Sequence, residues 1–522
     1  MDKGIFDVEQ DREIVGMESK MPDDEETLSQ EELDLKTSDD IHRRLEDNIR
    51  VLEEKAGLNK SFDVIFREMT FAGKRTGLFY YNGFADDLAL VEVLKRLSYV
   101  KKEELQPHAL ESFYEELVAH IQVDKVSTMS EVMMKVMAGG SALFVENETE
   151  AIVIDAKTFP QRGPDESTTE KVVRGSRDGF IETLLTNVTL VRRRIRDPRL
   201  KLEIMKVGKR TQTDVCVSYI NDIADLETVK SVKRKIQGAN VDGLPLGEKQ
   251  LEELLMERSW NPFPMVRYSE RPDVIASHLL EGHIVVFVDT SPSAMIIPTT
   301  MFHLVQHAEE YRQTSFIGTY LRWVRFIGIM ASIFLLPFWL LLVLQPELKP
   351  AGLGFIGPDK TGQLPIVMQI VLAEIGVDLM RLAAVHTPTP LATAMGLIAA
   401  ILIGDIAVQT GLFVNEVILY MAAAAIGMFA TPSYELGLAN RIVRLGLVAL
   451  VALFHVPGFV VGLTLTLILL AVQRSYNSPY LWPFLPFNGK ALLSILFRRP
   501  IQEQKRRPSI TKPVDSTRRP LH

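Results

Sequence analysis

A run of nineteen residues without a charge, FIGIMASIFLLPFWLLLVL from Phe326 to Leu344, most constrains what this chain can fold into. A helix of this length spans the roughly 30 Å hydrocarbon core of a bilayer. Further apolar runs follow it: LATAMGLIAAILIGDIAV, VILYMAAAAIGMFA and LGLVALVALFHVPGFVVGLTLTLILLAV. A buried helix bundle is the alternative for the shorter runs, but beside so clear a first span the sequence predicts a membrane domain.

The residues before Arg325 have a different pattern. FDVIFREMTFAGKRTGLFYYNGFAD contains two strand-like runs around a glycine turn, LALVEVLKRLSYV has helical spacing, and SALFVENETEAIVIDAK indicates a hairpin. After the polar linker PQRGPDESTTEK, helix and strand patterns return, ending with the strand pair in HIVVFVDTSPSAMIIP. We therefore predict an α/β cytosolic region of two subdomains, followed by an α-helical multi-pass membrane domain.

These patterns divide the 522 residues into five parts. The first is poor in aromatic residues and rich in acidic ones, so it cannot bury enough surface to fold. The predicted parts are an acidic disordered arm (1–40), α/β subdomain 1 (41–160), α/β subdomain 2 (161–310), a membrane domain with four to six spans (311–487) and a basic cytosolic tail (488–522).

The composition excludes several classes of function. A formal net charge of −8 argues against nucleic-acid binding. The single cysteine, Cys216, excludes an intramolecular disulfide and a multi-cysteine metal site. Phosphate-binding glycine motifs are missing from the sequence, as is any nucleophile with an evident base. We therefore predict no catalytic residue, no metal ligand and no cofactor, and hence a protein that is not an enzyme.

The arginines predict the orientation in the membrane. YLRWVR precedes the first span and RRPIQEQKRRP follows the last one, so both termini should face the cytosol and the number of crossings should be even. With four crossings, Arg441 and Arg444 would lie on the far side. With six, in which 370–385 also crosses and the last run folds as two segments, they return inside, and we prefer this count.

The stretch IVLAEIGVDLMRLAAV, residues 370–385, carries three charges within an apolar run. On a helix, Glu374, Asp378 and Arg381 project from one face. They line a polar path inside an oligomer, or they form the wet side of an interfacial helix. A charge near the bilayer centre costs about 2.5–3.5 kcal/mol unless it is paired or hydrated, and acidic rings attract cations. We favour the pore-facing interpretation.

Two further acidic residues, Asp405 and Glu416, bracket the loop QTGLFVN. They are candidates for a pore vestibule, although such residues also simply mark the ends of spans. Breaks in the helical pattern are candidate hinges or corners, because proline cannot continue the hydrogen-bond ladder and irregular backbone is tolerated in a membrane only where protein or a cavity surrounds it. The hinge candidates are Pro388, Pro390, Pro457 and Gly458.

Several long motifs carry a resemblance to a known family. They are LFYYNGFAD, VVRGSRDGFIETLLTNVTLVRRRIRDPRL, VGKRTQTDVCVSYI, RPDVIASHLLEGHIVVFVD, AEEYRQ, LAEIGVDLMRLAAVHTPTP and PYLWPFLPF. In this order, over about Phe62 to Phe487, they resemble the A subunits of the GerA family of spore germination receptors. QHAEEYRQ and DLMRLAAVHTPTP depart from the nutrient-receptor pattern, which has EDYY-like and RLP-like segments there. These departures favour the stage V type of member over a direct nutrient receptor.

The resemblance implies a location in the inner membrane of the spore and a role in germination. It implies a ring-like homo-oligomer, such as a pentamer, that contacts membrane lipid and another membrane subunit of the germination apparatus, and that conducts monovalent cations out of the spore. A non-conducting scaffold or signalling adaptor for germination receptors is the alternative function. Neither function implies enzymatic turnover.

Overall fold

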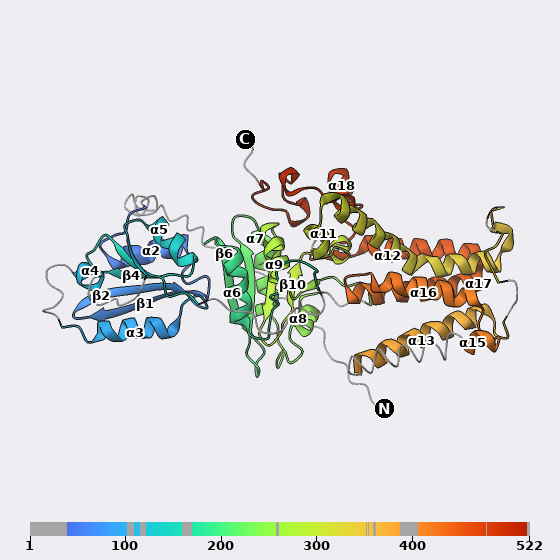
Figure 1. Ribbon diagram of the computed structural model, residues 1–522, viewed down its shortest axis with the longest axis horizontal. Helices are drawn as coiled ribbons and strands as arrows, with labels where there is room; N and C mark the ends of the chain where they lie inside the picture. Colours follow the sequence, from blue (N-terminus) through green and yellow to red (C-terminus); the bar gives the residue numbers. More distant parts are fainter. Residues whose placement is uncertain are drawn as a thin grey trace, which may run out of the picture.

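The computed structural model is elongated, with two α/β units and a set of long helices following one another along its long axis (Figure 1). Nearly all of the predicted acidic arm lies outside the described residues. The structure describes residues 39–101, 109–114, 122–158, 170–256, 260–350, 352, 354–358, 362–386, 406–476 and 478–518.

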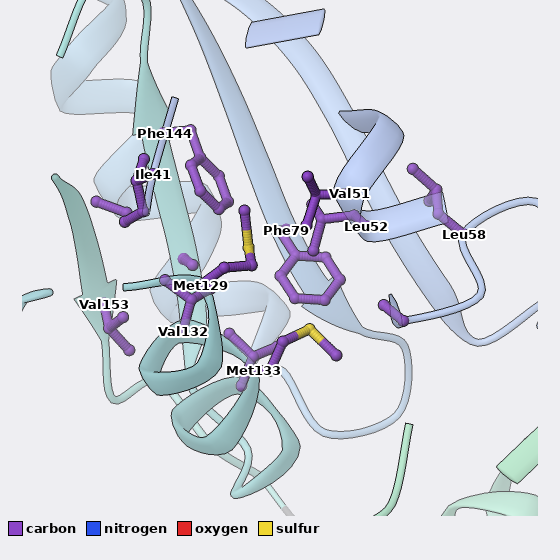
Figure 2. Close-up of a cluster of buried hydrophobic side chains, with 14 of the residues drawn as sticks. Ile41, Val51, Leu52, Leu58, Phe79, Met129, Val132, Met133, Phe144 and Val153 are labelled. Carbon is purple, nitrogen blue, oxygen red and sulfur yellow. The ribbon is translucent and has the colours of Figure 1, made fainter. Parts of the chain in front are cut away.

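Subdomain 1 is a five-stranded sheet in the order β1-β2-β4-β5-β3, with antiparallel neighbours throughout. Alternate strand residues face two separate apolar layers, so that on β4 Phe144 faces α2 and α5 while Leu143 faces α3 and α4. Figure 2 shows Phe79, Phe144, Met129 and Met133 packed together in the first of these layers. The elements are α2 (Leu45–Lys55), β1 (Val64–Phe71), β2 (Lys74–Tyr81), α3 (Asp87–Ser98), α4 (Ala109–Ser112), β3 (Val123–Val126), α5 (Met129–Met137), β4 (Ser141–Val145) and β5 (Ala151–Ile154).

Subdomain 2 has the same strand order, β6-β7-β9-β10-β8, and is again antiparallel. Its sheet is covered by α6 and α9 on one face and by α7 and α8 on the other. The elements are α6 (Leu184–Arg194), β6 (Leu200–Val207), β7 (Thr213–Ile220), α7 (Leu226–Gln237), α8 (Glu248–Leu255), β8 (Arg267–Ser269), α9 (Pro272–Leu280), β9 (Ile284–Val288) and β10 (Ala294–Ile297).

The predicted α/β character is confirmed, and the strand pairs expected from alternation are present in both subdomains. Two short helices, α10 (Met301–Leu304) and α11 (Ala308–Arg312), then lead into the helical region. This region contains α12 (Ser315–Leu344), α13 (Ile366–His386), α15 (Ile406–Gln409), α16 (Asn415–Phe429) and α17 (Tyr434–Val472). Among the described residues, α12 and α17 are the two helices long and apolar enough to cross a membrane.

Helix α17 is interrupted at His455, whose backbone (φ 54°, ψ −126°) is not helical. A Cβ on Gly462 would lie 2.6 Å from Leu447 Cδ2. In a straight helix these fifteen residues would span about 22 Å, so the two halves of α17 fold back on each other as a hairpin. The expected break in this run therefore falls two residues before Pro457.

The C-terminal segment returns to subdomain 2. Helix α18 (Gly489–Leu496) lies beside α11 and the start of α12 (Figure 1). Beyond it, Val514 N donates to Ile223 O (2.9 Å) and Thr511 Oγ1 to Glu281 O (2.8 Å). Arg507 Nε donates to Leu280 O (2.9 Å). The segment predicted as a basic tail thus packs against subdomain 2, with some of its arginines bound to protein.

Candidate functional site

The charges on α13 face a pair of arginines on α17. Glu374 and Asp378 are spaced four residues apart, and Arg441 and Arg444 three apart, so each pair projects from one face of its helix. Most of the residues around these charges on both helices are apolar, and therefore each charge needs a partner within the protein or water. The structure brings the two pairs together.

Glu374 is almost fully enclosed, with 1% of its surface exposed. Its carboxylate accepts from Arg444 Nε (2.6 Å) and Nη2 (2.9 Å) and from Arg441 Nε (2.9 Å). Arg444 Nη1 also donates to Ser332 O of α12 (2.7 Å). This carboxylate–arginine network therefore joins three helices, and its charge-assisted bonds compensate for the burial of the charges.

Asp378 completes the network by forming an ion pair with Arg441, so that two carboxylates balance two guanidinium groups. In contrast to Glu374, its side chain is 47% exposed in the single chain. The Arg381 guanidinium lies 4.2 Å from the centre of the Tyr434 ring, a cation–π contact at the start of α17. Of the three predicted residues, only Asp378 combines a bond inside the network with a surface that a neighbour or water can reach.

Glu416 has a different environment from the network. Its Oε2 accepts from Trp339 Nε1 (2.9 Å) and from the backbone N–H of Gly357 (3.0 Å). It lies in the first turn of α16, where the helix dipole favours a negative charge. Glu416 thus ties α16 to α12 and to the loop that follows α12.

The remaining predicted site residues are Asp405 and the four hinge candidates. Asp405, Pro388 and Pro390 lie outside the described residues. Pro457 and Gly458 begin the second half of α17, and a Cβ on Gly458 would overlap the carbonyl oxygen of Leu450. Only glycine therefore permits this close approach in the α17 hairpin.

Sequence reasoning treated Arg441 and Arg444 only as orientation signals, and it overlooked a second cluster of the same kind. The carboxylate of Glu310 on α11 is buried and paired with Arg322 and Arg325 of α12. Two arginines three residues apart inside or beside an apolar run, with a distant glutamate, are the common signal. The ion pairs of Glu310 with Arg322 and Arg325 fix α11 against α12.

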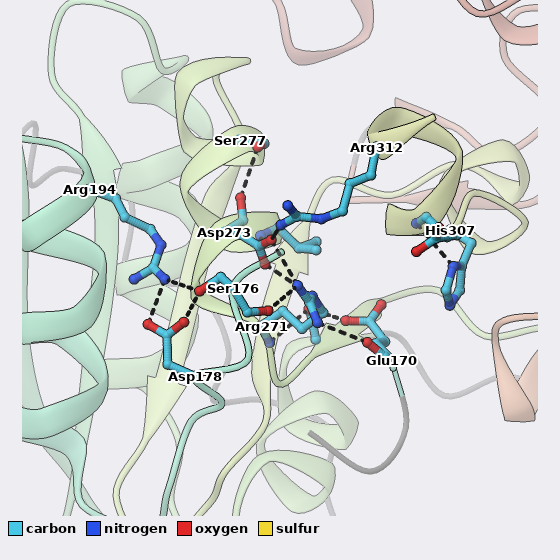
Figure 3. A network of polar contacts seen from close by, with 12 residues as sticks. Glu170, Ser176, Asp178, Arg194, Arg271, Asp273, Ser277, His307 and Arg312 are labelled. Atoms are coloured by element: carbon cyan, nitrogen blue, oxygen red, sulfur yellow. Dashed lines mark hydrogen bonds and ion pairs between the residues drawn. The ribbon is translucent and has the colours of Figure 1, made fainter. Parts of the chain in front are cut away.

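A further polar network joins the linker between the subdomains to α9 and α11 (Figure 3). Arg271, which is buried, donates from Nε to Asp273 Oδ1 (3.0 Å) and from Nη2 to Ser176 O (3.0 Å), and Arg312 of α11 pairs with the same Asp273. Burial alone would raise the pKa of Asp273, but the guanidinium groups of Arg271 and Arg312 lower it below its ordinary value. The carboxylate therefore stays ionised and holds α11 to subdomain 2.

Potential metal ligands and the single thiol are the other groups to consider. Within the described ranges, no group of three or more His, Cys, Asp or Glu is placed to hold a metal ion. Burial raises the pKa of the Cys216 thiol to about 12, so this thiol is protonated and unreactive near neutral pH. The candidate site itself consists of paired charges between helices.

The chain matches one protein family and several known proteins. Residues 52–510 match the family described as Bacillus/Clostridium GerA spore germination protein. The chain is 49% identical to "Stage V sporulation protein AF" of Bacillus subtilis (strain 168), over 92% of this chain and 98% of that one. It is 30% identical to "Spore germination protein B1" of the same organism, over 92% and 99%. The crystal structure of the N-terminal domain of the A subunit of the Bacillus megaterium spore germinant receptor GerK3 aligns with a TM-score of 0.38 and 27% identity, over 50% of this chain and 96% of that one.

Proposed function

Because the chain belongs to the GerA family of Bacillus/Clostridium spore germination proteins, we propose that it is the ion-conducting subunit of a membrane oligomer that releases monovalent cations during germination. Its site of action is the inner spore membrane. It works there as a ring-like homo-oligomer with another membrane subunit of the germination apparatus.

Six crossings are part of the proposal: α12, α13, the apolar run before α15, α16 and the two halves of α17. Helix α12 starts beside subdomain 2, and the chain is again beside subdomain 2 after α17, where Ser475 Oγ donates to Met265 O (2.6 Å). A chain that leaves and re-enters the same side crosses an even number of times. Both α/β subdomains and both termini are then cytosolic, in agreement with the arginines that flank the spans.

The carboxylate–arginine network carries the proposal. A neutral set of four charges between helices is stable in a low-dielectric environment, whereas a half-exposed Asp378 facing lipid would be costly. In an oligomer this carboxylate faces a neighbouring copy or water, where it attracts cations. Glu374 reaches such a path only when Arg441 and Arg444 release it. We therefore assign path lining to Asp378 and gating to Glu374.

A non-conducting scaffold is the second candidate. The enclosure of Glu374 by two arginines favours it, since a pure anchor would also need its helices fixed to one another. In that case the helices only hold the α/β subdomains among germination receptors, and the network has no part in transport.

Ion flux through purified oligomers in lipid vesicles separates the two functions. We expect Asp378→Asn to reduce the preference for cations, and Glu374→Gln to change opening more than selectivity. Glu347→Gln, an exposed carboxylate outside the long helices, is the matched control and should leave flux unchanged. A complete absence of current from correctly assembled oligomers would favour the scaffold. Unchanged selectivity in Asp378→Asn would remove the lining role.

A further inference from the structure

A cavity of about 280 Å³ lies where subdomain 2 meets the turn between α16 and α17. Helix α8, strand β8 and the end of α10 form one side, and residues 432–435 form the other. The volume is close to the lower end of the range for small-molecule sites. An occupant of this cavity would touch both the α/β region and the helical region.

Charged side chains of both signs line the cavity, with the negative sign in excess. The lining contains four carboxylates, Glu170, Glu248, Glu270 and Glu435, and two cations, Lys249 and Arg267. Each cation already has a carboxylate partner: Lys249 Nζ lies 2.9 Å from Glu435 Oε1, and Arg267 Nη2, on a buried side chain, 3.4 Å from Glu170 Oε1. Excess negative charge in a recess of reduced dielectric favours a positively charged occupant.

The rest of the lining indicates what kind of cation fits. Val266, Leu304 and Pro432 contribute apolar surface, which suits methylene groups rather than a hydrated metal ion. Across the part of the chain that the structure describes, the acidic residues form no cluster that could hold a metal. The Glu248 carboxylate, at the start of α8, has no hydrogen-bond or ion-pair partner among the described residues, and is available to a ligand.

We propose that this cavity binds a small organic cation, an ammonium or guanidinium group on a short aliphatic chain, which bridges Glu248 of subdomain 2 and Glu435 of α17. The occupant relieves repulsion among the carboxylates and tightens the joint between the two regions. Glu435 lies in the first turn of the helix that carries Arg441 and Arg444 further along. Ligand occupancy thus acts on the helix that holds the carboxylate–arginine network, and binding itself does not require conduction.

The test uses the purified full-length chain in lipid nanodiscs and measures binding of agmatine, a guanidinium and an ammonium joined by four methylenes. We expect saturable binding and a raised midpoint of thermal unfolding. Glu248→Gln and Glu435→Gln should each weaken binding by about 10-fold, as expected for the loss of one charge-assisted bond. Glu253→Gln, an exposed carboxylate on the same helix α8 but outside the cavity, is the matched control and should bind normally.

A second variant, Ser293→Leu, fills the cavity without changing its charge and should abolish binding. The proposal is overturned if agmatine does not bind, if both glutamine variants bind it as the wild type does, or if magnesium chloride of equal ionic strength raises the midpoint as much. Binding is measured without any current. A chain that binds agmatine but does not conduct would therefore contradict the proposed function and leave this site intact.

Discussion

The two α/β subdomains repeat one topology, and several individual interactions repeat with it. Asn48 before the middle of α2 pairs with both backbone groups of His42 (2.9 and 2.6 Å), and Asn187 of α6 does the same with Ile181 (2.8 and 2.5 Å). The residue directly after β4 is Glu146 and the one directly after β9 is Asp289, and these carboxylates accept from the first N–H of α2 and of α6, respectively. Such matched details indicate two copies of one structural unit.

The copies differ in what surrounds them. In subdomain 1 the face covered by α5 is an apolar core (Figure 2). In subdomain 2 the equivalent face adjoins three buried histidines, His278, His283 and His303, whose ring centres lie 5.0–5.9 Å apart, and the C-terminal segment packs outside them. One copy of the unit is thus a self-contained module, while the other is the joint that connects the chain to its long helices.

A buried ion pair holds the two copies together, and breaking it should have the largest effect. Arg192 of α6 binds Asp63 of subdomain 1 through Nε (2.8 Å) and Nη2 (3.1 Å), with both side chains buried. Arg192→Ala leaves an unpaired buried carboxylate, which costs about 3–5 kcal/mol. Labelling of Cys216, the only cysteine and buried in subdomain 2, should become much faster.

The exposed Arg199, which pairs with Asp197 and Asp222, provides the control, because a surface pair contributes at most about 1 kcal/mol. Replacing both partners of the buried pair, Asp63→Leu with Arg192→Leu, should restore much of the loss. Equal labelling rates in Arg192→Ala and Arg199→Ala would mean that the ion pair does not couple the copies.

Acid should open subdomain 2 before subdomain 1. Burial lowers the pKa of His283 to about 4, and it lowers the pKa values of His278 and His303 well below their ordinary value. These groups are neutral in the fold but take up protons near pH 6.5 when unfolded. The stabilisation that these neutral histidines give to the fold is therefore complete above pH 6.5 and is lost as the pH falls towards 4. For His283 the loss in the free energy of unfolding is about 3 kcal/mol.

The Arg267 guanidinium, which donates from Nη1 to His303 O, opposes protonation of these rings further. Labelling with 4,4′-dithiodipyridine, which reacts in acid, reports opening at Cys216. In a Cys216→Ala background, Ser141→Cys provides a nearly isosteric reporter on β4 of subdomain 1, where Ser141 is buried. An equal acid response of the two reporters would exclude the histidines as its cause.

The sequence predicts the strand pairs of both copies because their β-rich runs are separated by turns marked by glycine, as in β1–β2 and β6–β7, or by polar residues, as in β4–β5 and β9–β10. The repetition itself leaves only a faint signal, GKRT at 73–76 and again at 208–211. Strands β3 and β8 are too short, at four and three residues, to show a period. Local sequence patterns therefore predict most helices and strands, but they do not reveal that the two subdomains share one topology.

The candidate site divides in the same way. The stripe formed by Glu374, Asp378 and Arg381 follows from helical spacing alone. Its partner Arg441 is 67 residues away in the sequence, and no local pattern specifies a pairing over such a distance. The sequence therefore shows the charges around Glu374 and around Glu310, but it does not show that each glutamate pairs with two arginines.

The repeated asparagines allow a test of whether the copies are energetically equivalent. Asn48→Ala and Asn187→Ala each leave a backbone N–H and a carbonyl without their partner, at a cost of about 1–3 kcal/mol. We expect similar accelerations of labelling, at the introduced thiol of the Ser141→Cys reporter chain for the first and at Cys216 for the second. Asn240→Ala, at an exposed asparagine after α7 whose backbone is not left-handed, should change neither rate appreciably. A large effect in one copy alone would contradict equivalence.

The smallest expected difference concerns the helix caps. Asp86 accepts from Leu88 N and Ala89 N at the start of α3, and Asp225 accepts from Glu227 N at the start of α7, so either alanine substitution should cost about 1 kcal/mol. The outer face of α3 is exposed at Leu88, whereas Tyr476 packs beside α7, with its ring 4.9 Å from Lys235 Nζ. A lost cap should therefore fray α3 locally, while α7 stays held by the chain outside it.

Hydrogen exchange in the first turn of each helix measures this fraying, with Asp→Asn at both positions as the conservative control. Equal fraying of α3 and α7 would show that the segment around Tyr476 does not stabilise α7 in subdomain 2.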